Sequence, residues 1–218
     1  MPRTVADRFQ EERAHVARGL TVLAGVDEAG RGPLAGPVVA AAVILPAAWL
    51  TEGLPAELAG LNDSKQLTAA QREAFFAYIC AHSTIIHAVA IVDPAIIDHI
   101  NILQATHRAM NTALQQLARR PQHVLVDGLR VKSLVYPQTP LVKGDGRSYS
   151  IAAASVLAKV TRDRIMVAAD QRWPHYGFAQ NKGYPTPDHL AAVAQHGPCE
   201  IHRRSFAPLR QPEPDLFR

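Results

Sequence analysis

Two stretches decide the fold of this sequence, Thr21-Val-Leu-Ala-Gly-Val-Asp27 and Pro37-Val-Val-Ala-Ala-Ala-Val-Ile-Leu45. Each is short and almost wholly apolar, which is typical of a buried strand. Glycine and proline are frequent in the segment between them, so we expect a turn there and a hairpin-like start to a sheet. The first strand ends at an acid, Asp27, and a second acid, Glu28, follows it directly.

A later stretch repeats this pattern. The segment Gln122-His-Val-Leu-Val-Asp-Gly128 is again a short apolar strand that ends in an aspartate, Asp127. Residues 84–92 predict one more strand, and Thr68 with Gln71 forms a capping box that opens a helix. This helix is predicted to run over residues 68–82. Other helices are predicted over residues 4–20, 93–120 (a short helix followed by a longer one), 150–172 and 186–195, with loops over 47–62 and 174–185. This alternation of strands and helices predicts an α/β fold with a mixed central sheet.

The chain length of 218 residues predicts one α/β domain with an appendage. We expect an exposed N-terminal helix within residues 1–19, a main domain over residues 20–172, and a C-terminal helical and loop extension over residues 173–210 that packs on it. The tail from Pro208 on contains three prolines and is predicted to be loose.

The composition excludes several classes of protein. Hydrophobic residues make up 48% of the chain, but no apolar run is long enough to span a bilayer, and the charged first twenty residues do not resemble a secretory signal. Two cysteines without a close partner predict neither a disulfide framework nor a zinc site. We therefore expect a soluble, cytoplasmic protein. The net charge of +4 is compatible with a polyanionic partner.

The acids at the strand ends predict a metal site. If the strands that end in Asp27 and Asp127 are neighbours in one sheet, their carboxylates converge and repel each other unless a cation lies between them. Asp145, in a glycine-flanked loop, is placed to reach the same point. Such oxygen-rich clusters suit Mg²⁺ or Mn²⁺, and two ions can activate a water against a phosphodiester. The alternative is that these acids are solvated strand ends or helix caps, the commoner fate of a lone aspartate.

Other polar residues receive simpler interpretations. Asp163 lies four residues after Lys159 on a predicted helix, which indicates an ion pair rather than a metal ligand. The ten histidines show no metal-binding spacing. The segment Gly30-Arg-Gly-Pro-Leu-Ala35 matches the form of a dinucleotide fingerprint, but Pro33 has no N–H to donate and a strand follows it rather than a helix. Acids beside the phosphates would also repel them, so we reject a nicotinamide or flavin site.

Seven motifs, in this order along the chain, resemble the pattern of the bacterial ribonuclease HII family. They cover most of the chain from about Val22 to Pro208, and the ordered set is far more specific than any one of them. The motifs are Val26-Asp-Glu-Ala-Gly-Arg-Gly-Pro33, Asn62-Asp-Ser-Lys65, Val126-Asp-Gly128, Lys143-Gly-Asp145, Ser150-Ile-Ala-Ala-Ala-Ser-Val-Leu-Ala-Lys-Val-Thr-Arg-Asp163, Asn181-Lys-Gly-Tyr-Pro-Thr186 and His202-Arg-Arg-Ser-Phe206.

The resemblance implies an RNase H-like fold with a C-terminal helical part that helps to grip a duplex. It implies an endonuclease that hydrolyses the RNA strand of RNA/DNA hybrids, including single ribonucleotides embedded in DNA, and leaves 5′-phosphate and 3′-hydroxyl ends. It also implies a two-metal site that holds Mg²⁺ or Mn²⁺. The four carboxylates that the resemblance assigns to this site are Asp27, Glu28, Asp127 and Asp145.

The same resemblance assigns substrate contacts. Gly30, Arg31 and Gly32 are expected at the 2′-hydroxyl and the adjoining phosphates. Tyr184 resembles the family tyrosine that stacks on the deoxyribose beyond the RNA residue. Phosphate contacts are expected from Ser64, Lys65, Lys143, Arg147 and Lys182, although each is also compatible with a solvated polar side chain.

Two other functions compete with this one. A module that binds RNA/DNA without cutting it would need a broken acid set, and this set is whole. A related nuclease for another substrate, such as branched DNA, would share the acids but not the combination of Gly-Arg-Gly with Tyr184. We expect a monomer. The preferred ion, the relative activity on single ribonucleotides and on long hybrids, and any protein partner stay open.

Overall fold

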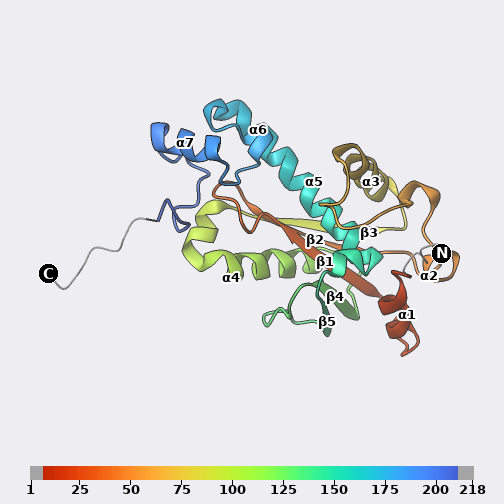
Figure 1. The fold of residues 1–218 in the computed structure, drawn as a ribbon. Helices are drawn as coiled ribbons and strands as arrows, with labels where there is room; N and C mark the ends of the chain where they lie inside the picture. Colours follow the sequence, from red (N-terminus) through yellow and green to blue (C-terminus); the bar gives the residue numbers. More distant parts are fainter. Residues whose placement is uncertain (1–6, 211–218) are drawn as a thin grey trace.

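A five-stranded mixed sheet forms the centre of the molecule (Figure 1). The computed structural model describes residues 7–210. The strands are β1 (Leu23–Ala29), β2 (Val38–Ile44), β3 (Ile86–Val92), β4 (His123–Asp127) and β5 (Gln138–Leu141), in the spatial order β3-β2-β1-β4-β5. Strand β1 pairs antiparallel with β2 and parallel with β4. The predicted hairpin-like start and the mixed sheet are therefore confirmed.

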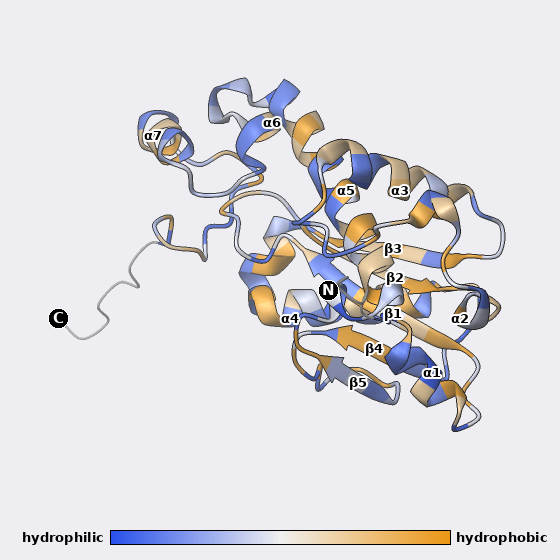
Figure 2. Cartoon of the chain, turned by 45° about the vertical axis from the view of Figure 1, so that its right-hand side comes forward, coloured by the Kyte–Doolittle hydropathy of each residue, from blue (hydrophilic) through white to orange (hydrophobic). Residues whose placement is uncertain are grey.

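Helices cover both faces of this sheet. One face packs on α4 (Pro94–Gln115), and the other packs on α5 (Tyr149–Arg172) and α3 (Ala69–Ala81). Side chains alternate between the faces of a strand, so alternate residues of β2 enter two separate cores. Val38 and Ala40 lie in the core with α4, whereas Val39 and Ala41 lie in the core with α5. Figure 2 shows the apolar residues concentrated along the strands.

Helix α5 lies directly against β1, and Gly25 makes this possible. A Cβ atom at Gly25 would lie 2.2 Å from the carbonyl carbon of Ser150 and 2.3 Å from the backbone nitrogen of Ile151. Since neither is a flexible side-chain end, any larger residue would push the helix away from the strand. The glycine therefore sets the spacing between the strand that carries Asp27 and the helix that follows Asp145.

The N-terminal helix is shorter and more buried than predicted. The sequence predicted an exposed helix over residues 4–20, but α1 runs over Gln10–Val16, and residues 4–6 lie outside the described part of the chain. Glu12 and His15 are buried. The Glu12 carboxylate accepts hydrogen bonds from the hydroxyls of Ser148, at 2.6 Å, and Ser150, at 2.8 Å. The helix is thus anchored at the start of α5 by a buried acid.

The other helices start close to where the sequence predicted, but some end elsewhere. The capping box of Thr68 and Gln71 is present at the start of α3. Helix α4 begins with proline in its first turn and is interrupted at Asn101, where φ is 66°, which matches the predicted short helix followed by a longer one. It ends at Gln115 rather than at Arg120. The loop predicted over 47–62 contains two short helices, α2 (Trp49–Glu52) and the 3₁₀ turn η1 (Ala56–Leu58).

The C-terminal part packs at the far end of α5 (Figure 1). It contains η3 (Pro174–Tyr176), α6 (Phe178–Asn181) and α7 (Pro187–His196), the last capped by the side chain of Thr186. Buried side chains from this part and from α5 form a separate small core. Residues 211–218 of the predicted loose tail lie outside the described residues. Among residues 7–210, no helix has the length and apolar character needed to cross a membrane.

Candidate active site

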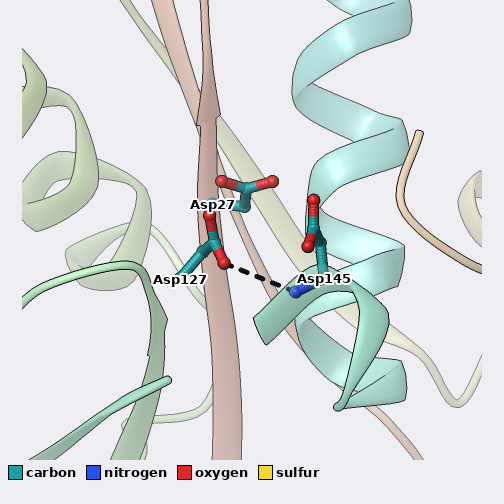
Figure 3. Close-up of side chains that lie close together, drawn as sticks. All are labelled: Asp27, Asp127 and Asp145. Atoms are coloured by element: carbon teal, nitrogen blue, oxygen red, sulfur yellow. Dashed lines mark hydrogen bonds between the residues drawn. The ribbon is translucent and has the colours of Figure 1, made fainter. Parts of the chain in front are cut away.

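Three aspartates meet at one edge of the sheet (Figure 3). The parallel pairing of β1 with β4 sets Val26 opposite Val126, so the next residue of each strand, Asp27 and Asp127, lies at the same level. Asp145 comes from the 3₁₀ turn η2 (Gly144–Gly146), and one carboxylate oxygen from each aspartate lies within 4.8 Å of the others. No other such group of His, Cys, Asp or Glu occurs in residues 7–210. We call Asp27, Asp127 and Asp145 the aspartate trio.

The turn that carries Asp145 is tied to Asp127 by backbone hydrogen bonds. Oδ1 of Asp127 accepts from the backbone N–H of Gly144 at 2.6 Å and, more weakly, from that of Asp145 at 3.4 Å, the contact drawn in Figure 3. A Cβ atom at Gly144 would lie 2.7 Å from Cδ1 of Ile151 and 3.0 Å from Cβ of Leu141, so a larger residue would require these side chains to shift. These contacts hold two acids together that are eighteen residues apart in sequence.

The aspartate trio is electrostatically unfavourable without a cation. Burial raises the pKa of Asp27 well above its usual value, and the charges of Glu28 and Asp127 raise it further. Burial also raises the pKa of Asp145 to about 6, with Asp127 adding to the effect. Buried carboxylates that repel each other, with oxygen atoms this close, form the donor set that hard divalent cations such as Mg²⁺ or Mn²⁺ prefer. The aspartates therefore fit a divalent metal ion.

Lys65 is the cation that faces these acids. Burial alone would lower the pKa of its ammonium group, but the negative charges of Asp63, Asp27 and Asp145 outweigh this effect, so the pKa is raised. One ammonium group offsets only part of the negative charge of three carboxylates. Lys65 therefore reduces the repulsion at the site and does not remove the need for a metal ion.

Glu28, which the sequence analysis placed with these acids, is not part of the aspartate trio. Its Oε1 accepts from Nη1 of Arg31 at 3.3 Å. Burial raises the pKa of Glu28, and the positive charge of Arg31 partly opposes this. The charge of Asp127 also raises this pKa, so Glu28 lies close enough to interact with the trio electrostatically. The structure thus places Glu28 beside the trio, with its carboxylate paired to arginine.

A cleft of about 460 Å³ opens at Asp27 and Glu28 and gathers many of the predicted substrate contacts. Among its lining residues are Gly30, Arg31, Gly32, Ser64, Lys65 and Tyr184. The hydroxyl of Ser64 is buried and accepts from that of Ser155 at 2.8 Å. A second cleft of about 570 Å³ lies on the other side of Glu28 and Arg31, between α4 and the loop after β4. Asp27 thus lines the first cleft, Asp127 lines the second, and Glu28 and Arg31 line both.

Three predicted phosphate contacts lie away from both clefts. Arg147 forms an ion pair with Glu11 at 3.0 Å, and Lys143 is an exposed residue at the start of the η2 turn. The ammonium group of Lys182 donates to the carbonyl of Ala179. The ion pair predicted between Lys159 and Asp163 is present, with 2.8 Å between Nζ and Oδ1.

The sequence analysis missed one acid at this site. Asp63 lies close enough to Asp145 to raise its pKa, both by its charge and through a side-chain hydrogen bond. Its Oδ1 accepts from the backbone N–H of Lys65 at 2.9 Å. The signal was available, because Asp63 stands in the Asn62-Asp-Ser-Lys65 motif, from which only Ser64 and Lys65 were selected.

Two buried arginines were also missed, and both hold the backbone of residues 30–37, which we call the glycine loop. Arg203 donates to the carbonyls of Gly30, Arg31 and Gly36. Its neighbour in space, Arg162, donates to the carbonyls of Ala35 and Pro37, and also to that of Lys182. Arginine offers several donors in a rigid planar group, so one side chain can fix several carbonyls at once.

Comparison with known proteins identifies this combination of fold and site. The family model described as Ribonuclease HII matches residues 24–209. The chain belongs to the ribonuclease HII family. It is 54% identical to a ribonuclease HII of Geobacillus thermodenitrificans over 202 residues, which cover 92% of this chain and 74% of that protein. It is 53% identical to a ribonuclease HII of Geobacter metallireducens over 193 residues, which cover 88% of this chain and 87% of that protein.

A solved structure supports the same family. The crystal structure of the ribonuclease H2 from Pyrococcus horikoshii OT3 is 29% identical, with a TM-score of 0.71, and the match covers 87% of this chain and 95% of that chain. The predicted fold class and family are therefore confirmed. As a ribonuclease HII, the protein is an endoribonuclease that cleaves RNA in RNA/DNA hybrids, and its acidic cluster agrees with metal-dependent catalysis.

Proposed function

We propose that Asp27, Asp127 and Asp145 hold the divalent ions, Mg²⁺ or Mn²⁺, that this endonuclease uses to hydrolyse the RNA strand. The observation that carries the proposal is the convergence of three carboxylates within 4.8 Å, one of which, Asp27, lines the cleft. Glu28 completes the ligand set in this proposal, with its Oε2 oxygen toward the ion while Oε1 accepts from Arg31 at 3.3 Å. When bound, two divalent ions supply an activated water and stabilise the leaving oxygen.

The chain's own residues orient the substrate around this site. We propose that Lys65, which faces the acids, contacts the phosphate next to the scissile one, and that Ser64 supports it from the buried side. Lys143, Arg147 and Lys182 lie outside the cleft, so their phosphate contacts would be peripheral to the reaction. The products expected from attack by water on the phosphorus are a 5′-phosphate and a 3′-hydroxyl.

The glycine loop and Tyr184 are proposed to select the ribonucleotide. A Cβ atom at Gly32 would lie 3.8 Å from Cε1 of Tyr184, so the tyrosine ring lies beside the Gly-Arg-Gly backbone. Tyr184 is 43% exposed and lines the cleft. Backbone groups of Gly30, Arg31 and Gly32 would contact the 2′-hydroxyl, the group that separates RNA from DNA. Tyr184 would stack on the next deoxyribose, which favours a single embedded ribonucleotide followed by DNA.

The organisation of the enzyme completes the proposal. Residues 20–172 form the catalytic domain, residues 173–210 form an extension that grips the duplex, and residues 1–19 contribute the N-terminal helix. We propose that the enzyme acts as a monomer. Cys80 and Cys199 are free thiols, which supports a reducing, cytoplasmic compartment.

The deciding experiment compares three duplexes of one sequence: all DNA, DNA with one ribonucleotide, and a long RNA/DNA hybrid. Each is incubated with Mn²⁺, with Mg²⁺ and with chelator. We expect cutting of the two ribonucleotide-containing duplexes only, only with metal, and with 5′-phosphate at the new end. Equal cutting of the all-DNA duplex would refute the ribonucleotide selection, and cutting in chelator would refute the metal role.

A further inference from the structure

A hydrogen-bonded chain of two buried histidines ends on the backbone of Tyr184. Nδ1 of His189 lies 2.8 Å from the carbonyl oxygen of Tyr184, and its Nε2 lies 3.0 Å from Nε2 of His202. Nδ1 of His202 in turn accepts from the backbone N–H of Cys199 at 3.0 Å. His189 is 0% exposed and His202 is 2% exposed, so these contacts are shielded from water.

Only one arrangement of protons satisfies this chain. The Tyr184 carbonyl can only accept, so Nδ1 of His189 carries a proton. In a neutral ring, Nε2 of His189 is then a bare acceptor, and Nε2 of His202 must donate to it. Nδ1 of His202 is therefore bare, as its contact with the Cys199 N–H requires. Every ring nitrogen of the two histidines has a partner, and all donors point toward Tyr184.

The surroundings keep both rings neutral. Burial lowers the pKa of His189, and burial together with the nearby His189 lowers the pKa of His202 to about 4. Aromatic rings enclose the pair, with Tyr176 4.8 Å from His202 and Phe178 5.4 Å from His189 between ring centroids. A buried polar chain of this kind is costly to leave partly unsatisfied, so it favours one geometry.

The same residues connect Tyr184 to the glycine loop. His202 lies in a segment that pairs with the loop, through Gly36 N–H to Ile201 carbonyl at 2.9 Å and Arg203 N–H to Leu34 carbonyl at 2.8 Å. Helix α7, which carries His189, starts two residues after Tyr184 at its capping residue. The histidine chain thus bridges the two backbone segments that form one side of the cleft.

We propose that His189 and His202 are positioning residues that fix Tyr184 against the glycine loop and thereby set the preference for a single ribonucleotide over a long hybrid. The inference rests on the role proposed above for Tyr184. Neither histidine lines the cleft, so each acts through the tyrosine and not on the substrate. The ligand that this arrangement selects is a ribonucleotide with a deoxyribonucleotide on its 3′ side.

The test measures kcat/KM on a single-ribonucleotide duplex and on a long hybrid for matched variants. His189→Leu removes the donor to the Tyr184 carbonyl, and we expect a loss about tenfold greater on the single ribonucleotide. His189→Asn retains a donor at the Nδ1 position and should keep the wild-type ratio within about threefold. The control is His196→Asn, an exposed histidine on the same helix, which should change neither rate.

A double variant separates positioning from a general structural role. In a Tyr184→Ala protein, His189→Leu should cause no further change in the ratio of the two rates, because the residue through which it acts is gone. Thermal melting of each variant checks the fold. Should His189→Leu not fold, His202→Asn replaces it, since asparagine keeps an acceptor for the Cys199 N–H but loses the donor to His189.

The outcomes are distinguishable. A changed ratio in Tyr184→Ala and in His189→Leu, with no additional change in the double variant, supports the inference. A changed ratio in Tyr184→Ala alone overturns the inference and leaves the proposed function in place. An unchanged ratio in both overturns the proposed role of Tyr184 and the inference with it. Equal losses on both duplexes for His189→Leu would show a structural role only, which also overturns the inference.

Discussion

Asp27 of the aspartate trio lines the same cleft as Gly30, Arg31 and Gly32 of the glycine loop, but different kinds of contact hold the trio and the loop. The trio is placed by backbone pairing, because the register of β1 with β4 aligns Asp27 and Asp127, and backbone N–H groups tie the η2 turn to Asp127. The glycine loop is held by long side chains from distant segments, chiefly Arg162 and Arg203. With the roles proposed above, hydrolysis would depend on the central sheet, whereas substrate selection would depend on α5 and the C-terminal part. Substitutions in the two regions should therefore affect hydrolysis and substrate selection separately.

The largest effect is expected for a substitution in the aspartate trio. Asp127→Asn keeps an oxygen that accepts from the Gly144 N–H, so the turn is retained, but it removes the charge that a divalent ion needs. We expect kcat to fall by about a thousandfold or more. Duplex affinity, measured by fluorescence anisotropy in chelator, should change by about threefold at most. Turnover within about tenfold of the wild type would contradict the ligand role of Asp127.

A smaller effect, on the stability of the protein, is expected for a substitution that removes a support of the glycine loop. Arg203→Met fills similar space but leaves the carbonyls of Gly30, Arg31 and Gly36 without their donor. We expect the free energy of unfolding, measured by urea titration, to fall by about 3 kcal/mol. The adjacent Arg204 is exposed, and Arg204→Met should stay within about 0.5 kcal/mol of the wild type. Similar decreases in the free energy of unfolding in both variants would show that Arg203 does not stabilise the glycine loop.

The pH dependence of stability should distinguish the trio with and without metal. The pKa of Asp145 is raised from 3.8 to about 6 in the folded protein, so between these values the folded state binds a proton that the unfolded state lacks. In chelator, stability should therefore rise as the pH falls through about 6. With Mn²⁺ the sign should reverse, since protons then compete with the ion.

The measurement is the melting temperature against pH for the wild type, from which that of Asp145→Asn is subtracted to remove the contribution of other acids. Mn²⁺ should also raise the wild-type melting temperature by mass action at neutral pH. The same slope with and without Mn²⁺, or no increase on adding the ion, would contradict metal binding at Asp145.

The smallest effect is expected at an ion pair outside the trio. Asp163→Asn removes the partner of Lys159 on α5, and exchange of a partly exposed pair of this kind changes the free energy of unfolding by about 0.5 kcal/mol or less. Cleavage rates on all duplexes should match the wild type. A metal-dependent loss of activity in this variant would show that the acidic site extends along α5.

The sequence predicted most of the elements that carry the trio. Short apolar strands ending in Asp27 and Asp127 are visible in the sequence because periodicity and composition are local signals. Asp145 was placed by its glycine-flanked loop. Strand β5 was missed, because Gln138–Leu141 has four residues, including Pro140, and proline is tolerated only at an edge strand such as this one.

The contacts that hold the glycine loop were harder to predict because they join residues far apart in the chain. Arg162 donates to Ala35 across 127 positions, and Arg203 donates to Gly30 across 173. A charged residue within a helix or a basic run normally indicates solvent exposure, so burial of these guanidinium groups had no local signal. The role predicted for Glu28 as a metal ligand stays a prediction, and the structure pairs its carboxylate with Arg31, three residues later in the chain.

The buried contact of Glu12 limits where the N-terminus of the protein can be truncated. Its carboxylate accepts from two serines at the start of α5, directly after the turn that carries Asp145. A truncated enzyme that begins at residue 20 would lack this acceptor, and the first turn of its longest helix would be free to fray beside the reactive centre. The seven-residue N-terminal helix thus holds the start of α5, next to the turn that carries Asp145, and removing it should impair hydrolysis even though the truncation spares every acid of the trio.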